Sequence, residues 1–241
     1  MNKDLIRQRF SKNLCTYNEN ANIQKKMAEK LVSILDTKNF NDILEIGCGT
    51  GLLTQIAVNK FEFKTYTAND IVSECSDFIS EINSNIEFIP GDIEEIIETS
   101  DKKYDLIISN ASLQWVENFE NIINKLISKL QENGILLFST FGKENFREIF
   151  FTLGEKLSYY SFSEIKEMFS KYNLKIEEEI HVMTFSSPKE VLKHLHYTGV
   201  NGIKQNKWTK KDMKEFENGY NNFCSNRPTL TYNPIYIMIK M

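Results

Sequence analysis

Cysteine and long apolar runs are scarce in this 241-residue chain, and each scarcity excludes a class of protein. The four cysteines lie far apart, at positions 15, 48, 75 and 224, with no C-x-x-C pair. That spacing is not typical of a disulfide framework or a metal site, so we expect reduced thiols in a cytoplasmic protein. No segment approaches the roughly 20 apolar residues of a membrane span. The first residues also lack the apolar core of a signal peptide.

Histidine is scarce as well, and the three histidines form no metal-binding pattern. His194 and His196 lie two residues apart on an expected helix, so they do not face each other. We therefore expect His181, His194 and His196 to be surface or rim residues, and we predict no metal site. Repeats and low-complexity linkers are also missing, and the length suits a single domain over residues 1–241.

Charge is unevenly distributed along the chain. Residues 1–30 hold seven Lys/Arg against three Asp/Glu, and residues 186–241 hold nine against four, while the whole chain carries a net charge of −4. A basic surface formed by both ends would attract an acidic partner. Lysines that are solvated independently of one another are the alternative. The chain lacks the aromatic-rich basic module that is typical of RNA binding, so no nucleic-acid partner is expected.

Hydrophobic periodicity predicts a sheet in the first part of the chain. Short apolar runs indicate strands over 42–46, 63–69, 86–89, 104–109 and 135–140. Helical patterns between them cover 51–60, a segment after Asp70, and 117–131, where Asn133-Gly134 would stop the helix. Strands that alternate with helices predict an α/β fold with a parallel, doubly wound sheet.

Further elements flank this region. We expect helices over 3–13, 20–36, 162–172, 188–198 and 209–224, short helical pieces within 143–157, and strands over 174–185 and 230–240. Ser163 is expected to cap the helix over 162–172, and Pro234 to be tolerated because the last strand lies near the sheet edge. The expected parts are an N-terminal helical lid (1–36), an α/β core (37–186), a helical cap (187–228) and a final strand (229–241).

The most informative segment follows the first expected strand. Glu45 ends an apolar run, and Gly47, Gly49 and Gly51 then alternate with small residues. Glycines there allow positive φ and a close approach of a ligand, and the start of the next helix favours an anion. Leu52 stands where a dinucleotide fingerprint has its third glycine, and the Lys and Ser/Thr of a P-loop are missing. The pattern therefore favours a nucleoside ligand with a carboxylate, which describes S-adenosylmethionine.

Polar groups follow the other strands at the same edge, where ligands of open α/β sheets bind. Asp70 could accept both ribose hydroxyls, and Asp92 could accept from an adenine amino group while Ile71 and Ile93 lie against the ring. The backbone of 110–111 could meet the methionine part. The candidate cofactor-binding residues at the strand ends are Glu45, Gly47, Cys48, Gly49, Gly51, Asp70, Ile71, Asp92, Ile93, Asn110 and Ala111.

With these groups at successive strand ends, residues 40–141 and the last strands resemble the class I methyltransferase fold. That family implies a Rossmann-like, seven-stranded, mostly parallel sheet with an antiparallel final strand, and S-adenosylmethionine as the methyl donor. No Asn-Pro-Pro-Tyr type turn follows the fourth expected strand, which argues against methylation of a base amino group.

A more specific resemblance covers nearly the full length: the chain is similar to the malonyl-acyl-carrier-protein O-methyltransferases of biotin synthesis. The similarity rests on Phe10, Tyr17, Ala21 and Gln24, and on segments 110–115, 140–142, 146–148, 191–195, 198–201 and 230–232. The chain departs from that family at Asn233-Pro234 and in its short cap.

This resemblance implies a reaction. A methyl group would pass from S-adenosylmethionine to the free carboxylate of a malonyl group on acyl carrier protein and form a methyl ester. Carboxyl groups titrate near pH ~4, so this acceptor is already ionised at neutral pH. No residue is therefore expected to act as an acid or base. The expected tasks are alignment of the reacting atoms and exclusion of water.

Four side chains have expected roles in that reaction. Tyr17 and Gln24 could close over the cofactor as a lid, and Trp115, with Tyr17, could form a wall of the substrate site. Arg147 could hold the malonyl carboxylate, because the planar guanidinium binds carboxylates in a bidentate way. An ion pair of Arg147 with a neighbouring glutamate, and plain packing of Tyr17 and Trp115, remain open alternatives.

The carrier protein would be the acidic partner of the basic ends. The lysines expected to meet it are Lys204, Lys207, Lys210, Lys211 and Lys214. Two other functions remain open: a class I enzyme that methylates a small carboxylic acid or metabolite, such as a trans-aconitate type methyltransferase, and a non-catalytic subunit that binds S-adenosylmethionine. A dinucleotide oxidoreductase is less well supported, because the third fingerprint glycine is missing.

Overall fold

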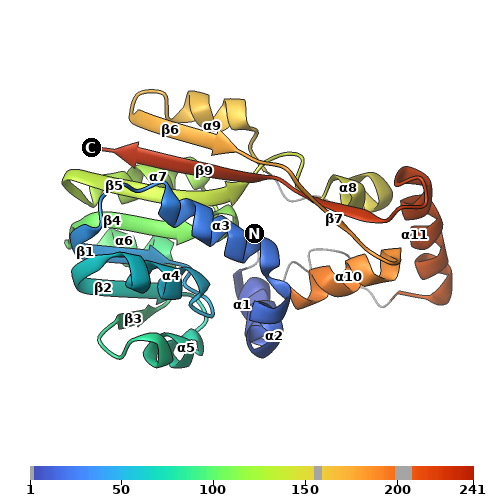
Figure 1. Cartoon of the computed structure of the whole chain (residues 1–241), viewed down its shortest axis with the longest axis horizontal. Helices are drawn as coiled ribbons and strands as arrows, with labels where there is room; N and C mark the ends of the chain where they lie inside the picture. The colour runs from blue at the N-terminus through green and yellow to red at the C-terminus, as the bar shows by residue number, and fades with distance from the viewer. Residues whose placement is uncertain (1–2, 155–158, 199–207) are drawn as a thin grey trace.

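The computed structural model describes residues 3–154, 159–198 and 208–241 and contains a seven-stranded sheet (Figure 1). The strand order is β3-β2-β1-β4-β5-β9-β6. Strands β1 to β5 run parallel to one another, and β9 is antiparallel to both β5 and β6. The strands are β1 (Asn39–Ile46), β2 (Glu62–Asp70), β3 (Glu87–Pro90), β4 (Tyr104–Asn110), β5 (Leu130–Phe141), β6 (Asn173–Glu178) and β9 (Pro234–Lys240). The predicted fold class is confirmed, including the antiparallel final strand.

Helices cover both faces of this sheet. One face carries α3 (Asn22–Ser33), α4 (Leu52–Lys60) and α5 (Cys75–Ile82), and the other carries α6 (Ile93–Thr99), α7 (Phe119–Ser128) and α9 (Phe162–Met168). The apolar side chains of each helix layer and the facing side of the strands form one buried cluster per face. These two clusters hold the strand ends, and thus the loops that follow them, in place.

The remaining elements form a lid and a cap at one end of the sheet. The lid consists of α1 (Lys3–Ser11) and α2 (Leu14–Asn20). The cap consists of α8 (Arg147–Leu153), α10 (Pro188–Tyr197), α11 (Lys210–Phe223), β7 (His181–Thr184) and β8 (Thr229–Tyr232). Figure 1 shows the cap beside the sheet, with α10 close to α2. Among the described residues, no helix is long and apolar enough to cross a bilayer.

Two expected strands are each divided in two. The segment predicted as a strand over 174–185 forms β6 in the large sheet and β7 in a separate two-stranded sheet. The last predicted strand likewise forms β8, which pairs with β7, and β9, which pairs with β5 and β6. Alternation of apolar residues reports a strand but not the sheet to which it belongs, so both breaks were missed.

The breaks meet at Asn233, which is fully buried. Its Nδ2 donates to Glu178 Oε1 at 3.0 Å and to the Glu179 carbonyl at 3.1 Å. Pro234 is the first residue of β9, one strand in from the sheet edge, and its carbonyl accepts from the Glu179 N–H. A first strand position tolerates proline, so the chain can turn from the cap into the sheet here.

Several helix boundaries also differ from the predictions. Ser161, rather than Ser163, caps α9, and it forms a capping box with Glu164. Helix α7 ends at Ser128, because the chain has already entered β5 before the Asn133-Gly134 turn. Helices α2 and α6 were not predicted, and the expected helical pieces within 143–157 correspond to α8 as far as the described residues show.

Candidate cofactor pocket

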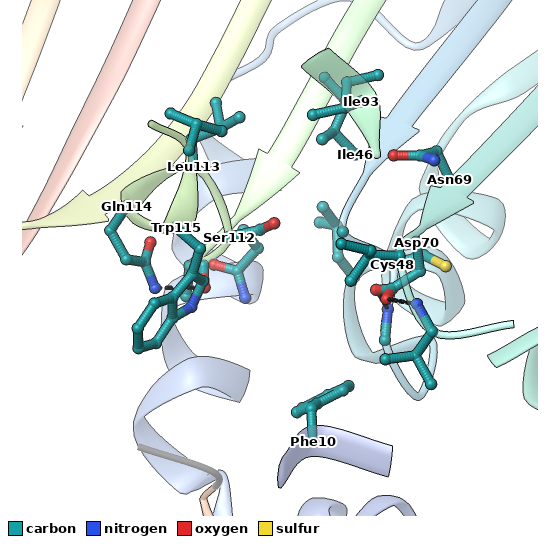
Figure 2. A pocket seen from close by; sticks show the side chains of 18 of the residues that line it. Phe10, Ile46, Cys48, Asn69, Asp70, Ile93, Ser112, Leu113, Gln114 and Trp115 are labelled. Carbon is teal, nitrogen blue, oxygen red and sulfur yellow. Dashed lines mark hydrogen bonds between the residues drawn. The ribbon is translucent and has the colours of Figure 1, made fainter. Parts of the chain in front are cut away.

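A pocket lies beyond the carboxyl ends of β1, β2 and β4 (Figure 2). The lid closes it on one side, with Phe10 of α1 facing the loops. Twelve of the fifteen predicted site residues line it: Tyr17, Gln24, Gly47, Cys48, Gly49, Asp70, Ile71, Asp92, Ile93, Asn110, Ala111 and Trp115. The sheet edge that the strand-end argument selected therefore does carry a pocket.

The glycine turn is held in a conformation that side chains rarely adopt. Gly47, Gly49 and Gly51 have φ values of 66°, 53° and 80°. A Cβ on Gly47 would lie 1.9 Å from Ser112 Oγ, and one on Gly49 would lie 3.1 Å from the Phe10 ring. Glycine is thus required both by backbone conformation and by the close approach of neighbours.

Asp70 at the end of β2 anchors this turn. One carboxylate oxygen accepts from the Gly49 N–H and the other from the Val72 N–H, both at 2.9 Å. Burial raises the pKa of this carboxyl, and the backbone hydrogen bonds oppose that rise. An ionised carboxylate only accepts hydrogen bonds, so this group suits a hydroxyl donor of a ligand.

Asp92 caps α6 at the end of β3. Its Oδ1 accepts from the Glu94 N–H at 3.0 Å, and its Oδ2 pairs with Lys3 Nζ at 2.5 Å. Lys3 also pairs with Glu94, so α1 is tied to this end of the pocket by two carboxylates. Lys3 was not predicted as a site residue, since a single lysine near a chain start belongs to no motif.

At another place in the pocket, Asn110 joins β4 to α3. Its Nδ2 donates to the Gln24 carbonyl at 3.0 Å, and its Oδ1 accepts from Ser139 Oγ at 2.7 Å. The Gln24 side chain is 4% exposed, and its Oε1 is buried with no hydrogen-bond partner within the described residues. A buried acceptor without a donor is costly, so a positively charged ligand group fits this place.

Tyr17 of α2 also lines the pocket. Its ring packs edge-on against Phe10, with centroids 5.0 Å apart. Burial, followed by the nearby Asp70 charge, raises the pKa of its hydroxyl, which therefore keeps its proton at neutral pH. The lid thus brings aromatic surface and a neutral hydroxyl to the pocket.

Three predicted site residues do not line this pocket. Glu45 lies within β1, and the alternation of the strand points its buried carboxylate at Thr54 and Tyr66 instead. Gly51 is the N-cap residue of α4 and is not part of the pocket lining. Arg147 on α8 is half exposed and lies near Glu144 and Glu148, at 3.5 and 3.9 Å, as the ion-pair alternative predicted.

The histidine expectation needs one correction. His194 is half buried, and its Nε2 lies 2.7 Å from the Tyr232 hydroxyl, so it is part of the interior of the cap rather than a rim residue. Burial lowers the pKa of His194, which favours the neutral ring. Within the part of the chain that the structure describes, no group of acidic, His or Cys side chains is arranged to hold a metal ion.

A second hollow adjoins the first. It shares Leu113, Gln114, Val116 and Phe141 with the cofactor pocket. Its other lining residues come from α7, β5, α9 and the segments before α7 and α9, and they are Glu117, Phe119, Thr140, Tyr159, Tyr160 and Ile165. We call this hollow the acceptor chamber.

The strand order and the pocket beyond the carboxyl ends define the chain as a class I methyltransferase. A methyltransferase domain model matches residues 17–179. The fold is shared with solved structures such as the N-methyltransferase NodS from Bradyrhizobium japonicum WM9 in complex with S-adenosyl-L-homocysteine. This chain and NodS superpose with a TM-score of 0.59 and are 13% identical, and the match covers 98% of this chain and 97% of NodS.

Relatives with similar sequences narrow the assignment from the methyltransferase class to one family. Malonyl-[acyl-carrier protein] O-methyltransferase from Calditerrivibrio nitroreducens is 40% identical over 230 residues, which cover 92% of this chain and 91% of that one. The protein of the same name from Acinetobacter baylyi is 36% identical, and the match covers 100% of this chain and 97% of that protein. The chain belongs to the family of malonyl-[acyl-carrier protein] O-methyltransferases.

Proposed function

We propose that this enzyme methylates the free carboxylate of a malonyl group carried by acyl carrier protein, an early step of biotin synthesis, with S-adenosylmethionine as the donor. The observation that carries the proposal is the similarity to relatives of that name over nearly the whole chain, cap included. The cytoplasmic location expected from the scattered cysteines belongs to the same proposal.

The pocket residues fit the proposed donor. Asp70 and Asp92 offer acceptors to hydroxyl and amino hydrogens, and the partnerless Gln24 Oε1 offers one to an ammonium group. When bound, the donor would supply an electrophilic methyl group on a positively charged sulfur. The carboxylate oxygen would form the new bond to that carbon, the carbon–sulfur bond would break with its electron pair left on sulfur, and no proton would move.

The described residues suit a reaction without a base. The neutral His194 is engaged with Tyr232, away from both pocket linings. Because a cation and an anion neutralise each other in this transfer, exclusion of water accelerates it. Phe10 and Tyr17 provide that exclusion by covering the pocket, and alignment of the reacting atoms supplies the rest.

A parallel assay tests the proposal. Labelled S-adenosylmethionine is offered with malonyl-carrier protein, malonyl-coenzyme A and free malonate, and mass spectrometry looks for a methyl ester on each. We expect an ester on the carrier substrate. Its absence there would contradict the assignment, turnover of free acids alone would support the small-acid enzyme, and cofactor binding without any turnover would support a non-catalytic subunit.

The carrier-protein contact is part of this proposal and is supported by exposed lysines at the start of α11. Lys210, Lys211 and Lys214 lie there, whereas Lys204 and Lys207 lie outside the described residues. Their positive charge would speed encounter with an acidic carrier more than it would add affinity.

Charge reversal tests the contact. K210E/K214E is expected to lower kcat/KM about three- to tenfold for malonyl-carrier protein at low salt and to leave malonyl-coenzyme A nearly unaffected. The matched control is K64E/K103E, two exposed lysines of which one lies near the amino end of β2 and the other directly before β4. An equal loss for both substrates, or for both variants, would count against docking at α11.

A further inference from the structure

For one hydroxyl in the acceptor chamber, that of Tyr159, the structure decides whether it donates or accepts its hydrogen bond to Asn145. Tyr159 lines this chamber, and its ring packs edge-on against Phe141, which lines both hollows. The Tyr159 oxygen lies 3.1 Å from Asn145 Nδ2. Whether the phenol donates or accepts there depends on how the Asn145 amide is oriented.

A backbone group decides that orientation. The Asn233 N–H, which can only donate, points at Asn145 Oδ1 at 3.2 Å. The amide oxygen is therefore on the Asn233 side, and the amide nitrogen must donate to Tyr159. Asn145 is 3% exposed, so this arrangement is enclosed by protein. The Tyr159 oxygen accepts from Asn145 and keeps its own proton for another partner.

No acceptor for that proton exists among the described residues, and the chamber is where one can enter. Burial raises the pKa of Tyr159, so the phenol remains a neutral donor at physiological pH. The described lining holds no Lys or Arg, and its one charged side chain, Glu117, is exposed.

The adjoining amide complements this donor. Gln114 lines both hollows, and its Nε2 donates to the Ala111 carbonyl at 2.7 Å. Its Oε1 is buried without a partner within the described residues. The Gln114 oxygen, as an acceptor, suits the positively charged methyl donor. The Tyr159 hydroxyl, as a donor, suits the negatively charged methyl acceptor.

We propose that the Tyr159 hydroxyl donates a hydrogen bond to the carboxylate of the methyl acceptor in this chamber, with Asn145 as the positioning residue; this rests on the proposed function. A neutral donor orients the anion without the strong ground-state binding that a cation would give. That matters because the carboxylate loses its charge in the transition state, so tight ionic binding before transfer would slow the step.

The test is Tyr159→Phe, which removes only the hydroxyl. We expect kcat/KM for malonyl-carrier protein to fall about ten- to hundredfold, the usual effect of losing a hydrogen bond to a charged group. The affinity for S-adenosylhomocysteine, read by calorimetry, should change less than about twofold. The matched control is Tyr172→Phe, whose hydroxyl donates to Asn124 outside both hollows and whose loss should leave kcat/KM unchanged.

A second variant tests whether Asn145 positions the Tyr159 hydroxyl. Asn145→Asp can still accept from the Asn233 N–H but cannot donate, so the Tyr159 proton should turn to the new carboxylate. We expect a loss close to that of Tyr159→Phe, and no further loss in the double variant. Additive losses would overturn the positioning role of Asn145.

The outcomes separate the two proposals. Wild-type protein that forms no ester on any malonyl substrate would overturn the proposed function and this inference with it. Wild-type ester formation with an unchanged Tyr159→Phe variant, or a variant that loses S-adenosylhomocysteine affinity in parallel, would overturn only the role of Tyr159.

Discussion

The cofactor pocket and the cap are built by different means. The pocket is made by short segments after the strands, where glycine conformations and backbone N–H groups hold Asp70 and the turn. The cap and acceptor chamber are made by side chains that bond to backbone far away in the chain, such as Asn145 to Asn233 and Glu148 to Thr231. Short segments after the strands thus form most of one region, and side-chain contacts between distant segments form the other.

The buried carboxylates of the two regions sharpen this contrast. Glu148 is 1% exposed, yet it accepts from the Thr231 N–H at 2.9 Å and from the Thr231 hydroxyl at 2.6 Å. Glu45 is fully buried and accepts on one oxygen only, while Oε1 has no partner within the described residues. The hydrogen bonds of the cap acid are therefore complete and those of the sheet acid are not, which predicts different responses to substitution.

The largest effect is expected at the glycine turn. Gly47→Ala should weaken S-adenosylhomocysteine binding at least about hundredfold, because a Cβ would lie 1.9 Å from Ser112 Oγ and 2.4 Å from its Cβ. Gly154→Ala is the matched control, since Gly154 also has positive φ (69°) but no atom within 4 Å of the added carbon. Calorimetry on both variants checks this; equal affinities would contradict the close packing of the turn.

The next effect concerns the pH dependence of stability. Burial raises the pKa of Glu45 to about 7 from 4.5, so the folded protein holds a proton that the unfolded chain releases between those values. The free energy of unfolding should therefore fall by about 3 kcal/mol as pH rises from 4.5 to beyond 7.

Glu45→Gln removes that titration. Urea unfolding of the variant and the wild type at pH 5 and pH 8 should show a smaller loss of stability in the variant. Parallel losses in both proteins would mean that Glu45 is ionised in the folded state at pH 5.

A smaller effect is expected in the cap. Glu148→Ala leaves the buried Thr231 N–H without an acceptor and should cost about 2 kcal/mol of unfolding free energy. Turnover of the carrier substrate should fall more than S-adenosylhomocysteine affinity, because the damage lies in the cap. Glu120→Ala, at an exposed position on α7, is the control and should change stability by less than about 0.5 kcal/mol. Equal loss of cofactor affinity would show that the two regions are not separable.

The same contrast explains what the sequence could predict. The five parallel strands, the glycine turn and the acids Asp70 and Asp92 were predictable, because each depends on neighbours in the chain. The position of Glu45 was also readable in principle: it lies inside the strand rather than after it, so alternation turns it away from the pocket.

The structure of the cap could not be predicted from the sequence, and the reason is physical. Its two short strands, the buried Asn233 and the half-buried His194 depend on partners far away in the chain, such as Glu178 and Tyr232. Periodicity carries no information on such pairings. Tyr159 likewise belongs to no motif, and its importance follows only from its place beside Asn145.

The central claim is that the pocket at the carboxyl ends of β1, β2 and β4 binds an adenosyl sulfonium. Calorimetric titration of the folded protein with S-adenosylmethionine, S-adenosylhomocysteine and a nicotinamide dinucleotide tests it most directly. The account predicts saturable one-to-one binding of the first two and none of the third. No heat with either sulfur compound, together with tight binding of the dinucleotide, would contradict it.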